Sequence, residues 1–185
     1  MSAAPERAML IKCFFAGFGG QGVLSMGYLL AYAAMKEGKA VTYLPAYGAE
    51  VRGGTAHCTV GISDEEIASP VASEPEYVVA MNQPSAKKFQ NALCSGGMMF
   101  INSTLVTEPP SRGDLELVEV PASAIAEALK NIQATNLVML GALIKKTGLV
   151  DLKSLELAVE DAFASKKKLI PMNLEAVRKG HGYLD

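Results

Sequence analysis

The sequence predicts an α/β fold: a Rossmann-like layered domain with a mainly parallel sheet, helices on both faces and a helical C-terminal part. Three observations predict it. Short apolar runs alternate with segments of helical periodicity, a glycine-rich loop joins the first run to the first helix, and every segment after Pro121 has a helical pattern. With 185 residues, 50% of them hydrophobic, the chain is expected to form one domain over residues 9–185, after a loose segment at 1–8.

The first elements follow from apolar runs that end at glycine or proline. Residues 9–16 are predicted to form a buried strand because the run is short, apolar and followed by glycine. Residues 23–37 repeat apolar side chains at helical spacing and stop at Gly38, a C-cap signal. A second strand is predicted at 40–44, ended by Pro45. Strand, loop, helix and strand make a βαβ unit, which favours a parallel sheet with a right-handed crossover.

The later elements are assigned by the same two periodicities. Further strands are predicted at about 56–62, 77–81, 98–102 and 115–120. Further helices are predicted at about 85–93, 122–131, 135–147, 152–164 and 173–179.

The loop at residues 17–22 reads GFGGQG and matches the pattern G-x-G-x-x-G after a strand and before a helix. Glycines there allow positive φ and let a phosphate approach the amides of a helix N-terminus. The alternative is that they only make a tight turn and close helix packing. A nicotinamide dinucleotide is disfavoured because the second strand has no acidic residue at its end. The candidate ligand residues of this loop are Gly17, Gly19, Gly20, Gln21 and Gly22.

A second glycine-rich segment, YGAEVRGG at 47–54, places an arginine beside paired glycines. A guanidinium with free amides suits a phosphate or carboxylate. The alternative is that Glu50 and Arg52 form structural ion pairs with neighbouring elements or another chain. His57 is expected at a strand edge rather than in catalysis, and Cys58 is expected to face the core. The candidate ligand residues here are Glu50, Arg52, Gly53 and Gly54.

Polar or glycine-rich segments follow four of the predicted strands, at 17–22, 47–54, 82–85 and 102–104. Ligands of parallel sheets bind beyond the carboxyl ends of the strands, so we expect these segments to gather at one edge as a site. Asn82 and Asn102 join the candidate ligand residues, whereas Ser85 could equally be a helix N-cap.

Composition excludes several function classes. A net charge of −2 gives no reason to expect nucleic acid or an anionic membrane. The cysteines at 13, 58 and 94 are isolated and predict free thiols, with no metal site. No apolar run is long enough for a signal segment or a membrane span, so a cytoplasmic location is expected. No nucleophile elbow, catalytic triad or paired carboxylates occur, and we assign no catalytic residue.

The sequence resembles the gamma subunit of the 2-oxoacid:ferredoxin oxidoreductases, which act on pyruvate, 2-oxoglutarate, branched-chain 2-oxoacids such as ketoisovalerate, and indolepyruvate. The pairing of GxGGQG with YGxExRGG is the specific part, and the resemblance extends over residues 10–184. The segments that carry it are GFGGQG at 17–22, YGAEVRGG at 47–54, YVVAMNQPS at 77–85, TNLVMLGAL at 135–143 and RKGHGYL at 178–184.

The resemblance implies a subunit of a complex that oxidatively decarboxylates a 2-oxoacid to acyl-coenzyme A and reduces ferredoxin. Thiamine diphosphate, Mg and iron–sulfur clusters are expected on alpha and beta partner chains, with a ferredoxin-like delta subunit as a further option. The present chain lacks a GDG diphosphate motif, since Gly113-Asp114 is followed by Leu115. It is expected to contribute to coenzyme A binding and assembly, and to be inactive alone.

Three alternatives remain at this point. The chain could be a ligand-free assembly module of that complex, a beta-type subunit of indolepyruvate oxidoreductase, or an independent nucleotide-dependent enzyme. Apolar helices and nine methionines also predict that the chain self-associates when it is produced alone, as a homo-oligomer.

Overall fold

The computed structural model describes residues 10–47, 55–67 and 74–184. The strands are β1 (Ile11–Phe18), β2 (Ala40–Tyr47), β3 (Thr55–Ser63), β4 (Tyr77–Ala80), β5 (Met98–Asn102) and β6 (Glu116–Val120). The α-helices are α1 (Val23–Lys36), α2 (Gln83–Phe89), α3 (Ala122–Ala128), α4 (Thr135–Thr147), α5 (Leu152–Ala162) and α6 (Ile170–His181). Short 3₁₀ turns occupy Gln90–Ala92, Ile132–Ala134, Ala164–Leu169 and Gly182–Leu184.

The six strands form one mixed sheet in the order β2-β3-β1-β4-β5-β6. Neighbouring strands from β1 to β6 pair in parallel, whereas β3 is antiparallel to both β1 and β2. The expected mainly parallel α/β sheet is therefore confirmed. The predicted βαβ unit is not confirmed as a pair of neighbouring strands, because β3 lies between β1 and β2. The connection at 48–54 is too short for a parallel crossover, so β3 has to return antiparallel to β2.

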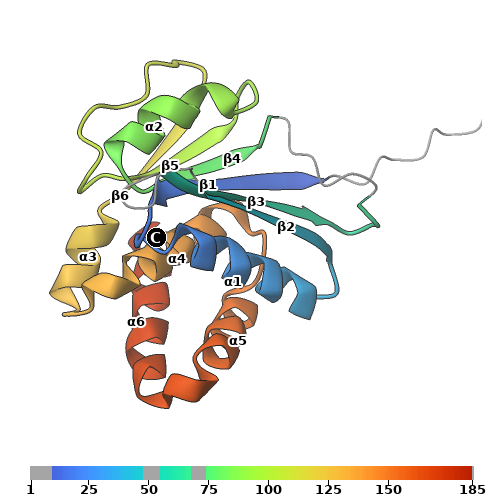
Figure 1. Cartoon of the computed structure of the whole chain (residues 1–185), viewed down its shortest axis with the longest axis vertical. Helices are drawn as coiled ribbons and strands as arrows, with labels where there is room; N and C mark the ends of the chain where they lie inside the picture. The colour runs from blue at the N-terminus through green and yellow to red at the C-terminus, as the bar shows by residue number, and fades with distance from the viewer. Residues whose placement is uncertain (1–9, 48–54, 68–73, 185) are drawn as a thin grey trace, which may run out of the picture.

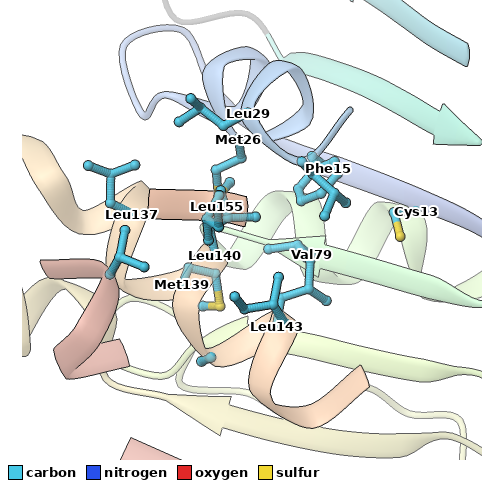
Figure 2. Close-up of a cluster of buried hydrophobic side chains, with 14 of the residues drawn as sticks. Cys13, Phe15, Met26, Leu29, Val79, Leu137, Met139, Leu140, Leu143 and Leu155 are labelled. Atoms are coloured by element: carbon cyan, nitrogen blue, oxygen red, sulfur yellow. The ribbon is translucent and has the colours of Figure 1, made fainter. Parts of the chain in front are cut away.

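Helices cover both faces of the sheet, but unequally. In Figure 1, α2 lies on one face, while α1, α4, α5 and α6 lie on the other. The larger core fills the space between the sheet and α1 and α4; Phe15, Met26 and Leu140 are fully buried there (Figure 2). A smaller core under α2 contains Val78 and Ile101. Most of the apolar surface that stabilises the fold is thus buried on the α1 side.

Two predicted boundaries are wrong for identifiable reasons. The second strand does not stop at Pro45 but continues to Tyr47. Since β2 is an edge strand, a residue without an N–H is tolerated there. The last helix begins at Ile170 rather than near residue 173, with proline in its first turn. Proline fits that position because its missing N–H would have no helical partner.

Helices α4 and α6 cross with their backbones almost in contact. A β-carbon on Gly180 of α6 would overlap the carbonyl oxygen of Val138 in α4. Likewise, a β-carbon on Gly141 of α4 would overlap the carbonyl oxygen of Val177 in α6. These two glycines belong to the segments TNLVMLGAL and RKGHGYL noted above, and the fold explains both by this crossing.

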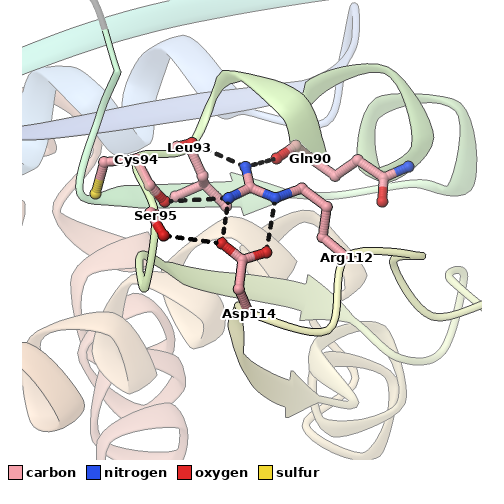
Figure 3. Close-up of polar contacts among 6 residues, drawn as sticks. All are labelled: Gln90, Leu93, Cys94, Ser95, Arg112 and Asp114. Carbon is pink, nitrogen blue, oxygen red and sulfur yellow. Dashed lines mark hydrogen bonds and ion pairs between the residues drawn. The ribbon is translucent and has the colours of Figure 1, made fainter.

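Arg112 ties the loop before β6 to the turn after α2, and a bidentate ion pair within that loop holds its guanidinium in place (Figure 3). Arg112 donates from Nε and from a terminal nitrogen to the two carboxylate oxygens of Asp114, at 3.0 and 2.6 Å. The same guanidinium donates to the carbonyl oxygens of Gln90 and Leu93, at 3.0 and 2.8 Å. The hydrogen bond from Arg112 lowers the pKa of Asp114 to about 2. Sequence reasoning missed Arg112, and Asp114 serves here as its structural partner.

No helix among residues 10–47, 55–67 and 74–184 combines the length and the apolar character that a membrane crossing requires.

Candidate functional site

The glycine loop is fastened to the neighbouring strand by a single side chain, that of Gln21. Its Oε1 accepts hydrogen bonds from the backbone N–H of Phe18 at 2.7 Å and from Nδ2 of Asn82 at 2.6 Å. Its Nε2 donates to the carbonyl oxygen of Met81 at 3.3 Å. Because Phe18 ends β1 and Met81 follows β4, these bonds fix the loop across two parallel strands at their carboxyl ends.

Asn82 extends this connection into α2. Its Oδ1 accepts from the backbone N–H of Ser85 at 2.9 Å and caps the helix, while its Nδ2 donates to Gln21. The N-cap is therefore Asn82 rather than Ser85. Both ends of the Asn82 carboxamide are used within the protein, so this residue positions the glycine loop in the present structure. Its predicted contact with a ligand stays a prediction.

The four loop glycines have two different roles. A β-carbon on Gly17 would lie 2.7 Å from Cγ1 of Val23, and one on Gly22 would lie 2.5 Å from Nδ2 of Asn136. These two positions therefore require glycine for packing. A β-carbon on Gly19 or Gly20 would meet nothing within 4 Å, and both residues are exposed. Gly20 has a φ of 95°, which favours glycine. Close packing thus explains Gly17 and Gly22, and the turn explains Gly20, whereas neither explains Gly19; Gly19 and Gly20 both face open space.

A hollow of about 400 Å³ lies against this loop at the start of α1. Its lining consists of the exposed glycines, the first helical turn and nearby apolar side chains: Phe18, Gly19, Gly20, Gly22, Val23, Leu24, Ser25 and Ala56. The first amides of a helix have no partner within the helix, and the dipole there favours negative charge. We call this hollow the glycine-loop site. None of its lining residues is acidic, so it can receive an anionic group such as a phosphate.

The two strands that flank the second predicted loop have their adjoining ends at the same edge of the sheet as the glycine loop. Ala56 of β3 pairs with Tyr47 of β2 on one side and with Gly17 of β1 on the other. Both attachment points of the segment 48–54 therefore lie beside the glycine loop. Four predicted ligand residues lie in that segment, outside the described residues: Glu50, Arg52, Gly53 and Gly54.

Asn102 does not join the glycine-loop site. Its side chain is fully buried at the end of β5, two strands away from β1. Its Oδ1 accepts from the backbone N–H of Ser123 at 3.2 Å, and its Nδ2 donates to Oγ of Ser123 at 2.8 Å. This pair joins β5 to the start of α3. The carboxyl ends of the strands do share one edge, as expected, but the Asn102 side chain serves the fold.

The buried thiols have no access to a substrate. Cys13 and Cys58 are fully buried, and Cys94 is half-buried. Burial raises the pKa of Cys58 to about 12 and raises the pKa of Cys13 as well. Cys58 faces the core, as expected, and its Sγ lies 3.4 Å from the carbonyl oxygen of Val23. Within the described ranges no group of three His, Cys, Asp or Glu side chains could hold a metal ion.

His57 lies on the interior strand β3, not on an edge strand. Its ring stacks on Phe14, with centroids 5.2 Å apart, and lies 5.7 Å from the ring of Phe89. Nδ1 is buried and forms no hydrogen bond with the part of the chain that the structure describes. Burial, and secondarily the positive charge of Lys88, lower the pKa of this imidazole.

The lowered pKa of His57 predicts an acid-sensitive contribution to stability. The folded protein binds a proton at His57 less readily than the unfolded chain. The contribution is therefore complete above the ordinary pKa of about 6.5 and is lost as the pH falls toward the lower folded value. Urea unfolding at about pH 7.5 and about pH 5 measures this effect, because the window spans the ordinary histidine pKa. His57→Gln should lose less stability between these pH values than wild type; parallel losses would contradict the prediction.

Comparisons with known proteins show which family model and which relatives this chain matches. A family model described as pyruvate ferredoxin/flavodoxin oxidoreductase matches residues 12–183. The ketoisovalerate oxidoreductase subunit VorA of Methanothermobacter thermautotrophicus is 44% identical over 172 residues, which are 92% of this chain and 35% of VorA. The chain thus spans about a third of that relative's length.

Two solved structures share the fold. The gamma subunit of a keto/oxoacid ferredoxin oxidoreductase from Geobacter sulfurreducens has a TM-score of 0.81 and 28% identity, over 93% of this chain and 96% of that one. The 2-oxoglutarate:ferredoxin oxidoreductase of Magnetococcus marinus, solved with 2-oxoglutarate, coenzyme A and succinyl-CoA, has a TM-score of 0.86 and 24% identity. The matched region is 94% of this chain and 30% of that one, and at this identity the likeness concerns the fold.

Proposed function

Since this chain belongs to the pyruvate ferredoxin/flavodoxin oxidoreductase family, we propose that it is the gamma-type subunit of a 2-oxoacid:ferredoxin oxidoreductase and that its glycine-loop site holds phosphates of coenzyme A. The complex would convert a 2-oxoacid to acyl-coenzyme A and pass electrons to ferredoxin. The resemblance to a gamma subunit over nearly the full length of both chains supports the first part of this proposal.

One observation carries the coenzyme A assignment. Gln21 fixes the loop so that Gly19 and Gly20 leave open space beside the free amides of α1. That arrangement suits phosphate oxygens, which accept backbone hydrogen bonds and interact favourably with the helix dipole. A solved structure of the same fold contains coenzyme A, which is consistent with the assignment. The part of Arg52 in it remains a prediction from sequence.

The redox cofactors are proposed to lie on partner chains. Thiamine diphosphate requires Mg, and iron–sulfur clusters require grouped thiolates. The donor set of the described residues fits neither, because Cys13 and Cys58 point into the core and no cluster of ligating side chains occurs among them. We accordingly expect alpha and beta subunits, with or without a ferredoxin-like delta subunit, to provide the oxidative chemistry. We also propose that the complex lies in the cytoplasm.

A ligand-free assembly role is the second candidate, and the apolar part of the glycine-loop site favours it. Phe18, Val23, Leu24 and Ala56 all line the hollow, and a partner side chain could fill it. The two functions differ in what a substitution within the hollow would change: coenzyme A dependence in one case, and the yield of complex in the other.

The variant Gly19→Asp distinguishes coenzyme A binding from a ligand-free assembly role. Since a β-carbon at Gly19 meets no atom, the variant should fold normally. Its carboxylate would repel a bound phosphate and raise the KM for coenzyme A of the assembled complex about tenfold, which corresponds to ~1.4 kcal/mol. The KM for the 2-oxoacid should remain unchanged. Gly113→Asp is the matched control, because its β-carbon also has open space and it lies outside the site. Reduced assembly with an unaltered KM would instead favour the assembly role.

A further inference from the structure

Strand β2 (Ala40–Tyr47) forms one edge of the sheet, and its outer side faces away from the other strands. It pairs with β3 alone among the strands of the described residues. Figure 1 shows β2 at the outside of the sheet, next to α1. An edge strand presents a row of backbone N–H and C=O groups along its outer side, and such a row is a template for pairing with another chain.

The opposite edge of the sheet is protected against such pairing, whereas β2 is not. The edge strand there, β6, has five residues and carries Glu116 and Glu119, both exposed. A short edge strand with charged side chains disfavours pairing with a second chain. In contrast, β2 has eight residues with the sequence AVTYLPAY, which contains no Asp, Glu, Lys or Arg.

Pro45 is the one residue type in β2 that opposes strand pairing. Proline has no N–H, so it removes a single donor from the strand, but its carbonyl oxygen can still accept a hydrogen bond. Edge strands tolerate a proline for this reason. Pro45 therefore weakens pairing at one position of an eight-residue strand and leaves the rest of the edge intact.

Exposed apolar side chains lie beside this edge on both faces of the sheet. Tyr28 and Met35 of α1 are 49% and 59% exposed, and their spacing of seven residues puts them on one face of the helix. The ring of Tyr28 lies edge-on to that of Tyr43 in β2, with centroids 6.4 Å apart. Leu44, the next residue of β2, points to the opposite face and is 43% exposed. Apolar surface next to an uncharged edge is typical of a protein interaction site.

A second copy of the same strand fits these features. Two identical antiparallel strands are related by a twofold axis, so each copy supplies the donors and acceptors that the other needs, and twofold dimers are the commonest homo-oligomers. Because β2 carries no charge, its pairing with itself brings no like charges together. Self-pairing of β6 would place glutamates near glutamates, which is unfavourable.

We propose that this chain forms a twofold-symmetric dimer in which β2 pairs antiparallel with β2 of a second copy and the two six-stranded sheets become one. Leu44 is central in β2, so the Leu44 side chains of the two copies would lie close to the twofold axis. No residue of β2 lines the glycine-loop site, so this inference does not rest on coenzyme A binding and either proposal can fail alone.

Sedimentation velocity of the full chain over the micromolar concentration range measures the dimer. Leu44→Lys would place two ammonium groups near the twofold axis and remove an apolar contact, which should weaken dimerisation about tenfold. Because the side chain is exposed, the circular dichroism spectrum should match that of wild type. Leu105→Lys is the matched control, since Leu105 is 45% exposed in the turn after β5, away from β2.

A mixture of two variants tests the pairing itself. Leu44→Glu alone should weaken dimerisation as Leu44→Lys does, because it also brings like charges together. Mixing the two variants should restore a dimer that contains one copy of each, since opposite charges then lie near the twofold axis.

Hydrogen exchange on wild type locates the interface without any substitution. The amides of Ala40–Tyr47 should exchange more slowly as the protein concentration rises, while those of Glu116–Val120 should not change. The proposal is overturned if wild type stays monomeric throughout, or if Leu44→Lys and Leu105→Lys have equal effects on dimerisation. It is also overturned if the β2 amides become protected only when other subunits of the complex are added, because that result assigns the edge to a partner subunit.

Discussion

Replacing Gly180 with alanine should lower the free energy of unfolding by about 3 kcal/mol, the upper end of the range for overpacked cores. The new β-carbon would overlap the carbonyl oxygen of Val138, a backbone atom that cannot rotate away. Helices α4 and α6 would have to separate and lose contact along their crossing. Alanine favours the helical state over glycine by about 1 kcal/mol, which offsets only part of this loss.

Urea unfolding monitored by circular dichroism measures the effect. Gly141→Ala should behave similarly, because its β-carbon would overlap the carbonyl oxygen of Val177 in the same crossing. Gly113→Ala is the matched control: it has neither close neighbours nor a positive φ, and should stay within about 0.5 kcal/mol of wild type. Stability gains in the two helical variants, as propensity alone predicts, would contradict the close crossing.

Gln21→Ala should have the second largest effect, a loss of about 2 kcal/mol in the free energy of unfolding together with weaker coenzyme A binding. Three hydrogen bonds depend on this side chain, two at Oε1 and one at Nε2. Its removal leaves the N–H of Phe18 and the side chain of Asn82 with fewer partners. Because Gln21 is half-buried, water can replace some of the lost hydrogen bonds. The expected loss in the free energy of unfolding is therefore smaller than the sum for three buried hydrogen bonds.

Two further variants sharpen this prediction. Gln21→Glu keeps both acceptor bonds but loses the donor to Met81, so its stability should lie between those of alanine and wild type. Gln133→Ala is the control, because Gln133 is an exposed glutamine that forms no hydrogen bond with the described residues. If Gln21→Ala and Gln133→Ala had equal stability by urea unfolding, the role of Gln21 in fixing the loop would be wrong.

The sequence predicted elements best where hydrophobic periodicity and an element-ending glycine or proline indicate the same boundary. The helix predicted at 23–37 matches α1 closely, because apolar spacing and Gly38 mark its extent, whereas β1 is shifted by two residues from the strand predicted at 9–16 and continues into the predicted loop as far as Phe18. The insertion of β3 between β1 and β2 was missed, since periodicity does not report strand order. The short connection at 48–54 was the available signal, because it allows only an antiparallel return.

For the site, residue type alone could not separate ligand contacts from supports. Gln21 and Asn82 were predicted to bind a ligand, and the structure shows both engaged in fixing the loop. Only three-dimensional contacts distinguish Gly17, which packs against Val23, from Gly19, which packs against nothing.

Direct binding of coenzyme A tests the central claim, that the glycine-loop site holds phosphates. Isothermal titration should be performed on the isolated chain and on the assembled complex, each with wild type, Gly19→Asp and Gly113→Asp. We expect saturable binding that Gly19→Asp weakens about tenfold, ~1.4 kcal/mol, while Gly113→Asp matches wild type. Equal dissociation constants for all three proteins, or no binding by either the chain or the complex, would contradict the claim.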